Sequence, residues 1–111
     1  MNIWSLLKHK NIKLLLFNLE FSLGRNSFYI DPMVDKDFNS AMLFKSDQDE
    51  VRAYIYLHGQ SKDSYGIHLE YPIYMENNLS GSIRLYDNLS RQQIVDILAA
   101  HFNAASHEVA V

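Results

Sequence analysis

The chain contains no cysteine, and this absence excludes several kinds of chemistry at once. Disulfides, thiolate metal sites, redox dithiols and cysteine nucleophiles all need the sulfur atom of that side chain. A chain without them suits a reducing compartment, so we expect a cytoplasmic protein. Glycine and proline are also scarce, at four and two residues, while 48% of the residues are hydrophobic. This composition excludes disordered and collagen-like chains and predicts a domain that folds unaided.

Long apolar runs are absent as well. The strongest candidate, Leu14-Leu15-Leu16-Phe17, is followed closely by the polar residues Asn18 and Glu20. A membrane-spanning helix needs about 20 apolar residues. We therefore expect no membrane partner. No repeat or linker divides the 111 residues, so the sequence predicts a single domain over residues 1–111.

Charge is distributed unevenly along the chain, whose net charge is −3. Residues 31–50 carry six acidic side chains and two lysines, which gives this segment a charge of −4. The acidic residues are Asp31, Asp35, Asp37, Asp47, Asp49 and Glu50. Such a segment repels phosphate backbones and attracts a basic partner, although a solvated loop would use it for solubility alone. We expect these residues to contribute to partner binding, and we expect no nucleic-acid partner.

The first half of the chain predicts one short helix followed by strands. Asn2 is placed to cap a helix that runs to about Lys10. Residues 15–23 alternate in polarity, which is typical of a half-buried strand. Further short strands are expected at residues 28–30 and 41–45, the latter followed by an acidic turn.

The second half has clearer periodicity. Residues 51–58 and 65–71 alternate on either side of a loop and should pair as an antiparallel hairpin, with a further strand near 82–86. A capping box, Ser90-Arg91-Gln92-Gln93, starts a helix that should end near Asn103 and leave residues 104–111 as a loosely held tail. The order of elements predicts an α+β fold, in which an antiparallel or mixed sheet of about five or six strands is covered on one face by an N-terminal and a C-terminal helix.

The familiar linear motifs for nucleotide binding, zinc proteolysis and serine hydrolysis are absent. Candidate residues must therefore come from side chains that neighbouring strands bring together. The apolar side of the strands is formed by Val51, Ala53, Ile55, Leu57, Ile67, Leu69, Ile83 and Leu85. The opposite side gathers Arg52, Tyr54, Tyr56, His58, His68, Glu70, Arg84 and Tyr86. Tyr and Arg are enriched at protein–protein hot spots, although Tyr is also favoured on ordinary strands. We interpret this side as a second candidate surface for partner binding.

His58 and His68 also suggest an acid–base pair. Two imidazoles on neighbouring strands could act as general base and general acid, with Glu70 or Tyr56 assisting and Arg84 holding an anion, as in metal-independent ribonucleases. A nucleic-acid enzyme would carry a more basic surface, however. We therefore expect no catalytic activity, no cofactor and no metal site, and a small ribonuclease-like enzyme remains an alternative.

A small acidic α+β domain without cysteine or a catalytic motif, and with an aromatic sheet face, resembles the immunity proteins of bacterial contact-dependent growth inhibition systems. The resemblance covers general features of the whole chain and carries over no functional residue. It implies a cytoplasmic inhibitor that binds the toxin domain of a neighbouring cell's surface protein, often a nuclease, and blocks its active site or its substrate access. An acidic inhibitor can occupy a basic toxin surface by charge complementarity. A secretion chaperone or adaptor is a further alternative, which stable homodimerisation would favour.

Overall fold

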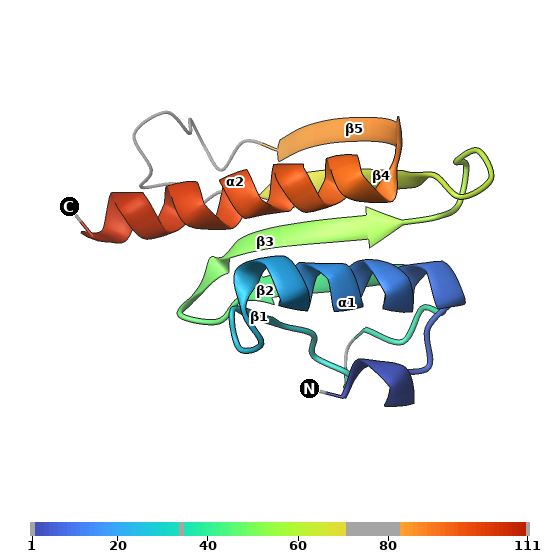
Figure 1. Ribbon diagram of the computed structural model, residues 1–111, viewed down its shortest axis with the longest axis horizontal. Coiled ribbons are helices and arrows are strands. Elements are labelled where there is room, and N and C mark those ends of the chain that lie inside the picture. The colour runs from blue at the N-terminus through green and yellow to red at the C-terminus, as the bar shows by residue number, and fades with distance from the viewer. Residues whose placement is uncertain (1, 34, 71–82, 111) are drawn as a thin grey trace.

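The protein folds as two helices packed on a sheet. The computed structural model describes the backbone of residues 2–33, 35–70 and 83–110, with side chains for residues 2–33, 35–70 and 86–103. In chain order (Figure 1) the elements are the 3₁₀ helix η1 (Ile3–Ser5), helix α1 (Lys10–Leu23), strands β1 (Phe28–Tyr29), β2 (Ser40–Lys45), β3 (Gln48–Tyr56), β4 (Tyr65–Glu70) and β5 (Ile83–Leu89), and helix α2 (Arg91–Ala110). This arrangement confirms the predicted α+β class.

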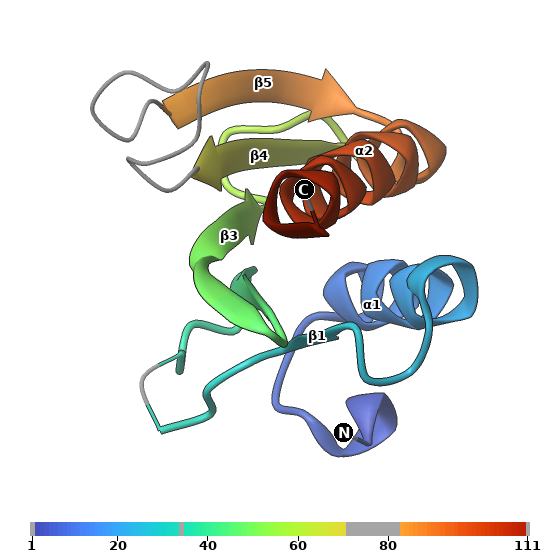
Figure 2. The same ribbon diagram turned by 90° about the vertical axis from the view of Figure 1, so that its left-hand side faces the viewer.

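Within the described residues, five strands form one sheet in the order β1-β2-β3-β4-β5, and each neighbouring pair is antiparallel. The predicted hairpin is the β3–β4 pair, in which Ile55 lies opposite Ile67. Both long helices lie side by side against one face of the sheet, as predicted, and neither of them covers the other face (Figure 2). We call this second side the open face.

Helix α1 occupies the stretch in which we predicted a strand over residues 15–23, so that prediction is wrong. Its buried side chains follow helical spacing and face the core; they are Ile12, Leu15, Leu16 and Leu19. Because this run contains so many apolar residues, it satisfies a period of two as well as a period of 3.6. Gly24, with a φ of 104°, ends the helix. The predicted first helix is reduced to the single turn η1.

Helix α2 begins at the predicted cap. The Ser90 hydroxyl accepts a hydrogen bond from the backbone N–H of Gln93 at 3.2 Å, and the side-chain oxygen of Gln93 accepts one from the N–H of Ser90 at 2.8 Å. These reciprocal bonds are the capping box that the sequence predicts. The helix continues to Ala110, past the expected end at Asn103, so the backbone of residues 104–110 is helical where we expected a tail.

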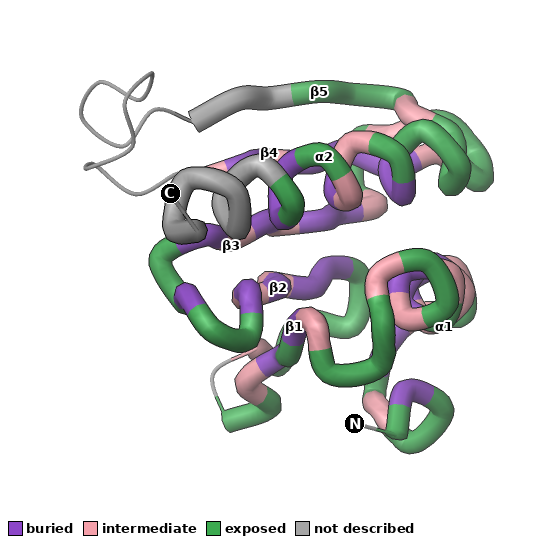
Figure 3. Tube along the Cα trace, turned by 60° about the vertical axis from the view of Figure 1, so that its left-hand side comes forward, coloured by how far each residue is buried: buried purple, intermediate pink, exposed green. Residues whose placement is uncertain are grey.

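The core lies between the helices and the covered face of the sheet, and burial is concentrated there (Figure 3). The side of β3 and β4 predicted to face the helices is buried, at Val51, Ala53, Ile55, Ile67 and Leu69. Leu57 is partly buried against the same cluster. The side chains of Ile83 and Leu85, which we also assigned to this side, lie outside the described residues.

One titratable side chain of α2, His101, is buried in this core. It is 2% exposed, and its Nε2 lies 2.9 Å from the carbonyl oxygen of Arg52 on β3. Burial lowers the pKa of His101 to about 4, and hydrogen bonding to the backbone of Arg52 and Glu70 opposes this effect only in part. The imidazole is therefore neutral at pH 7 and links α2 to the sheet.

Candidate functional site

Four aromatic rings form a cluster on the open face. Two belong to β3, one belongs to β4, and one lies just beyond the end of β3. Tyr54 and Tyr56 stack with their centroids 5.6 Å apart, and His58 stacks on Tyr56 at 4.8 Å. His68 meets Tyr54 and Tyr56 edge-on at 5.7 and 5.0 Å. We call these four residues the aromatic cluster. The sequence pattern assigned all four to this face, and the structure brings them into contact.

Tyr56 is the central ring of the aromatic cluster and is fixed from two directions. It lies over Gly66, its cross-strand partner, where an added Cβ would come within 2.2 Å of the ring. Its hydroxyl donates a hydrogen bond to Asp87 Oδ1 at 2.9 Å. Desolvation above all, followed by the hydrogen bond with Asp87, raises the pKa of Tyr56, so the hydroxyl remains protonated at pH 7. Sequence reasoning missed both Gly66 and Asp87.

The ring surface continues across β2 to β1. Tyr29 and Phe44 stack with centroids 5.2 Å apart, and the guanidinium carbon of Arg52 lies 5.4 Å from the centroid of Phe44. Arg52 pairs in register with Glu70 of β4 and donates from Nε to the carbonyl of Asp49 at 2.9 Å. Sequence reasoning missed Tyr29 and Phe44. Each of them lies between two buried residues in the chain, and this alternation is a signal that could have placed both on the open face.

Acidic side chains project at the β2–β3 end of the sheet. The pairing of β2 with β3 skips three residues at the start of β3, and Asp49 and Glu50 are exposed in the resulting bulge. Asp47, in the preceding turn, is also exposed and forms an ion pair with Lys45. The hydrogen bond from Lys45 lowers the pKa of Asp47, so it is charged at pH 7. We call Asp47, Asp49 and Glu50 the acidic bulge.

The other three predicted acidic residues lie in the connection between β1 and β2, where their carboxylates accept hydrogen bonds from within the protein. One carboxylate oxygen of Asp35 lies 2.6 Å from the ammonium of Lys8, and both side chains are less than a tenth exposed. The second oxygen accepts the backbone N–H of Met42 at 2.8 Å. Asp31 and Asp37 each accept a backbone N–H two residues further along. Asp35 therefore stabilises the fold. The negative charge that a partner can reach at this end of the sheet is that of the acidic bulge.

The two histidines of the candidate acid–base pair both pack against Tyr56. His68 lies opposite Tyr54 in register, whereas His58 lies two residues beyond the end of β3. The ring of Tyr56 contacts both imidazoles.

Strand β5 differs from its predicted placement. Its register pairs Tyr86 with Ile67, whose side chain is buried on the covered face. Paired residues of an antiparallel ladder share a face, so Tyr86 belongs to the covered side rather than to the open face. Asp87, the next residue, reaches Tyr56 on the open face instead. The side chain of Arg84 lies outside the described residues.

No protein family, curated protein or solved structure matches the chain. Function is therefore inferred from its own residues. In the part of the chain that the structure describes, no three His, Asp or Glu side chains gather closely enough to hold a metal ion. No described helix has the length and apolar character needed to cross a membrane. Two described pockets are lined by residues of α1, and neither includes a member of the aromatic cluster.

Proposed function

We propose that this protein is an immunity protein, which binds and neutralises a toxin domain with a basic surface by occluding its active site or substrate-binding surface. The observation that carries the proposal is the aromatic cluster on a sheet face that neither long helix covers. Tyrosines and arginines dominate the energetics of protein interfaces because they bury large areas and keep a hydrogen-bonding tip.

The cluster is well prepared for binding because its rings are already held in place. Tyr56, which is only 8% exposed, is seated on Gly66 and bonded to Asp87, and it supports the three more exposed rings that a partner would contact. Side chains that are ordered before association lose little conformational freedom on binding, so more of the contact energy contributes to affinity. Rigid tyrosines are used in the same way in antibody binding sites.

The acidic bulge supports a basic partner. Asp49 and Glu50 are exposed there, and Arg52 bonds to the backbone of Asp49 while its guanidinium lies near the ring of Phe44. The acidic residues therefore border the ring surface rather than a separate part of the molecule. Charges at an interface rim accelerate association with a partner of opposite sign and help to select it.

We expect a gene beside that of this protein to encode the toxin domain, and the experiment uses that domain. We expect cells that make this domain to grow only when they also make the protein, and we expect the purified pair to form a stable complex. Tyr54→Ala should weaken the complex tenfold or more, roughly the effect of losing a hot-spot tyrosine. Phe21→Ala is the matched control, because Phe21 is an aromatic residue that is 88% exposed on α1.

Two results would contradict the proposal. One is unrestored growth together with no complex between the purified proteins. The other is cleavage of RNA by the protein alone, provided that His58→Ala or His68→Ala abolishes it, which would establish the ribonuclease-like alternative. Equal urea midpoints for the wild type and Tyr54→Ala would show that a loss of affinity does not come from unfolding.

A further inference from the structure

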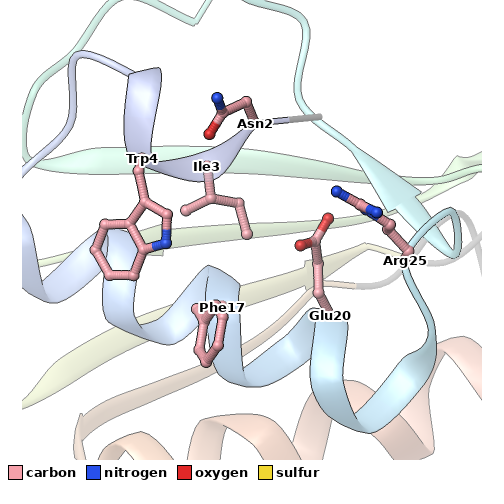
Figure 4. Close-up of a pocket in the computed structure, with 6 residues that line it drawn as sticks. All are labelled: Asn2, Ile3, Trp4, Phe17, Glu20 and Arg25. Carbon is pink, nitrogen blue, oxygen red and sulfur yellow. The ribbon is translucent and has the colours of Figure 1, made fainter.

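A pocket of about 460 Å³ lies between η1 and the second half of α1. Figure 4 shows the six residues that line it, which are Asn2, Ile3, Trp4, Phe17, Glu20 and Arg25. Its volume is within the range of pockets that hold small ligands, roughly 300–1,000 Å³. The pocket is separate from the open face, and its use does not depend on the proposed function.

The two elements that form the pocket are fixed to each other. Ile3 is 2% exposed and anchors η1 in the core. The ammonium of Lys13 on α1 donates a hydrogen bond to the carbonyl of Trp4 at 3.1 Å. The pocket is therefore a built part of the fold rather than a gap beside a loose terminus.

Aromatic rings form one wall of this pocket. The centroids of Trp4 and Phe17 are 5.9 Å apart, with their planes inclined by 40°. Trp4 is 54% exposed and Phe17 is 50% exposed, so much of both rings faces solvent. A ligand that covered these rings would remove apolar area from water. The faces of aromatic rings also attract cations, and indole does so most strongly.

Glu20 supplies a charge opposite these rings. One oxygen of its carboxylate is buried and has no hydrogen-bond partner among the described residues, and Glu20 forms no ion pair with Arg25, which lies beside it in the pocket wall (Figure 4). A buried carboxylate oxygen without a donor is unfavourable, so an N–H group that reached this carboxylate would satisfy it. Rotation about the terminal torsion of Glu20 can present either oxygen to the pocket, because this torsion is soft.

We propose that the pocket binds the cationic end of an alkylguanidinium or alkylammonium group, of the size of an arginine or lysine side chain. Its apolar stem would lie against Trp4 and Phe17, and its N–H groups would donate to the carboxylate of Glu20. Arg25 competes in this arrangement, because its positive charge lies on the pocket wall beside the same carboxylate. Removing Arg25 should therefore strengthen binding rather than weaken it.

The test uses fluorescence, since Trp4 is the only tryptophan in the chain. The protein is titrated with butylguanidinium chloride and with N-acetyl-L-arginine amide at constant ionic strength, below concentrations that unfold it. We expect a saturable change for both and none for butylurea, their neutral analogue. Tighter binding of the arginine amide would assign the site to a protein side chain, and tighter binding of butylguanidinium would assign it to a free small molecule.

Variants separate specific binding from general effects. Glu20→Gln should weaken binding about tenfold, because a charge-assisted hydrogen bond is lost. Asp96→Asn removes an exposed carboxylate on α2 and should leave binding unchanged. Arg25→Ala should strengthen binding severalfold. The proposal is wrong if neither the wild type nor Arg25→Ala gives a saturable change, or if Glu20→Gln binds as tightly as the wild type while remaining folded.

Discussion

Replacing Lys8 with Met should destabilise the protein strongly, because it leaves a buried carboxylate without its cation. In the wild type the ammonium of Lys8 lies 2.6 Å from Asp35 Oδ1 and donates to the carbonyl of Asp37 at 2.6 Å. The side chains of Lys8 and Asp35 are 4% and 9% exposed. Methionine retains most of the apolar stem, so the change mainly removes the charge and two hydrogen bonds.

The expected loss for Lys8→Met is about 3–5 kcal/mol of the free energy of unfolding, which is typical when one partner of a buried ion pair is removed. Asp35→Asn should cause a loss of the same order, since it leaves the ammonium of Lys8 buried opposite an amide. The double variant contains no unpaired charge. Its loss should therefore fall short of the sum of the single losses by about 2 kcal/mol or more.

Urea denaturation followed by circular dichroism measures each of these losses, provided that the slope with urea concentration stays constant across the variants. Lys62→Met is the matched control, because Lys62 is exposed and its replacement should change stability by no more than about 0.5 kcal/mol. A loss below about 1 kcal/mol for Lys8→Met, or strictly additive losses in the double variant, would refute the reasoning.

Three further predictions follow from other contacts. His101 has a pKa of about 4 in the folded protein, below its unfolded value of about 6.5. Its contribution to the free energy of unfolding is therefore fully present above pH 6.5, and protonation should reduce that free energy by roughly 2–3 kcal/mol at pH 4.5. In His101→Gln this loss between pH 7 and pH 4.5 should be absent, which urea denaturation at the two pH values would show. Gly66→Ala should displace the ring of Tyr56 and alter its near-ultraviolet circular dichroism, and an unchanged spectrum would contradict the close packing. Reversing Asp47, Asp49 and Glu50 to Lys should mainly slow association with the toxin domain and weaken its salt dependence in stopped-flow measurements; an unchanged rate would exclude the acidic bulge from recognition.

The elements with clear local signals could be predicted from the sequence. The capping box at Ser90 located the start of α2, because side-chain hydrogen bonds to backbone N–H groups depend only on residues within one turn. Regular alternation likewise indicated which residues of β3 and β4 face the core. Helix α1 was missed because its dense apolar run fits both periods, and only packing of Leu15 and Leu16 against the rest of the core selects the helix.

The members of the candidate site could be predicted only where the alternation along a single strand decides which face a side chain occupies. The rings of Tyr54, Tyr56 and His68 follow from alternation along β3 and β4. The hydrogen bond of Tyr56 with Asp87 does not, because it depends on the register of β5, which shifts at an irregularity between Tyr65 and Ile67. A strand register is set by cross-strand packing and turn geometry, and neither can be read from a short alternating segment.

The strand order has a consequence for how the protein folds. Each strand pairs with its neighbour in the chain, so β2, β3 and β4 are joined through short connections. The entropy lost in closing a loop rises with its length, which makes these local hairpins the least costly contacts to form. The packing of α1 on α2 joins opposite ends of the chain and needs the largest loop to close. We expect the rings of the aromatic cluster to assemble before this helix pair docks, so that a newly made chain displays its proposed binding face early in folding.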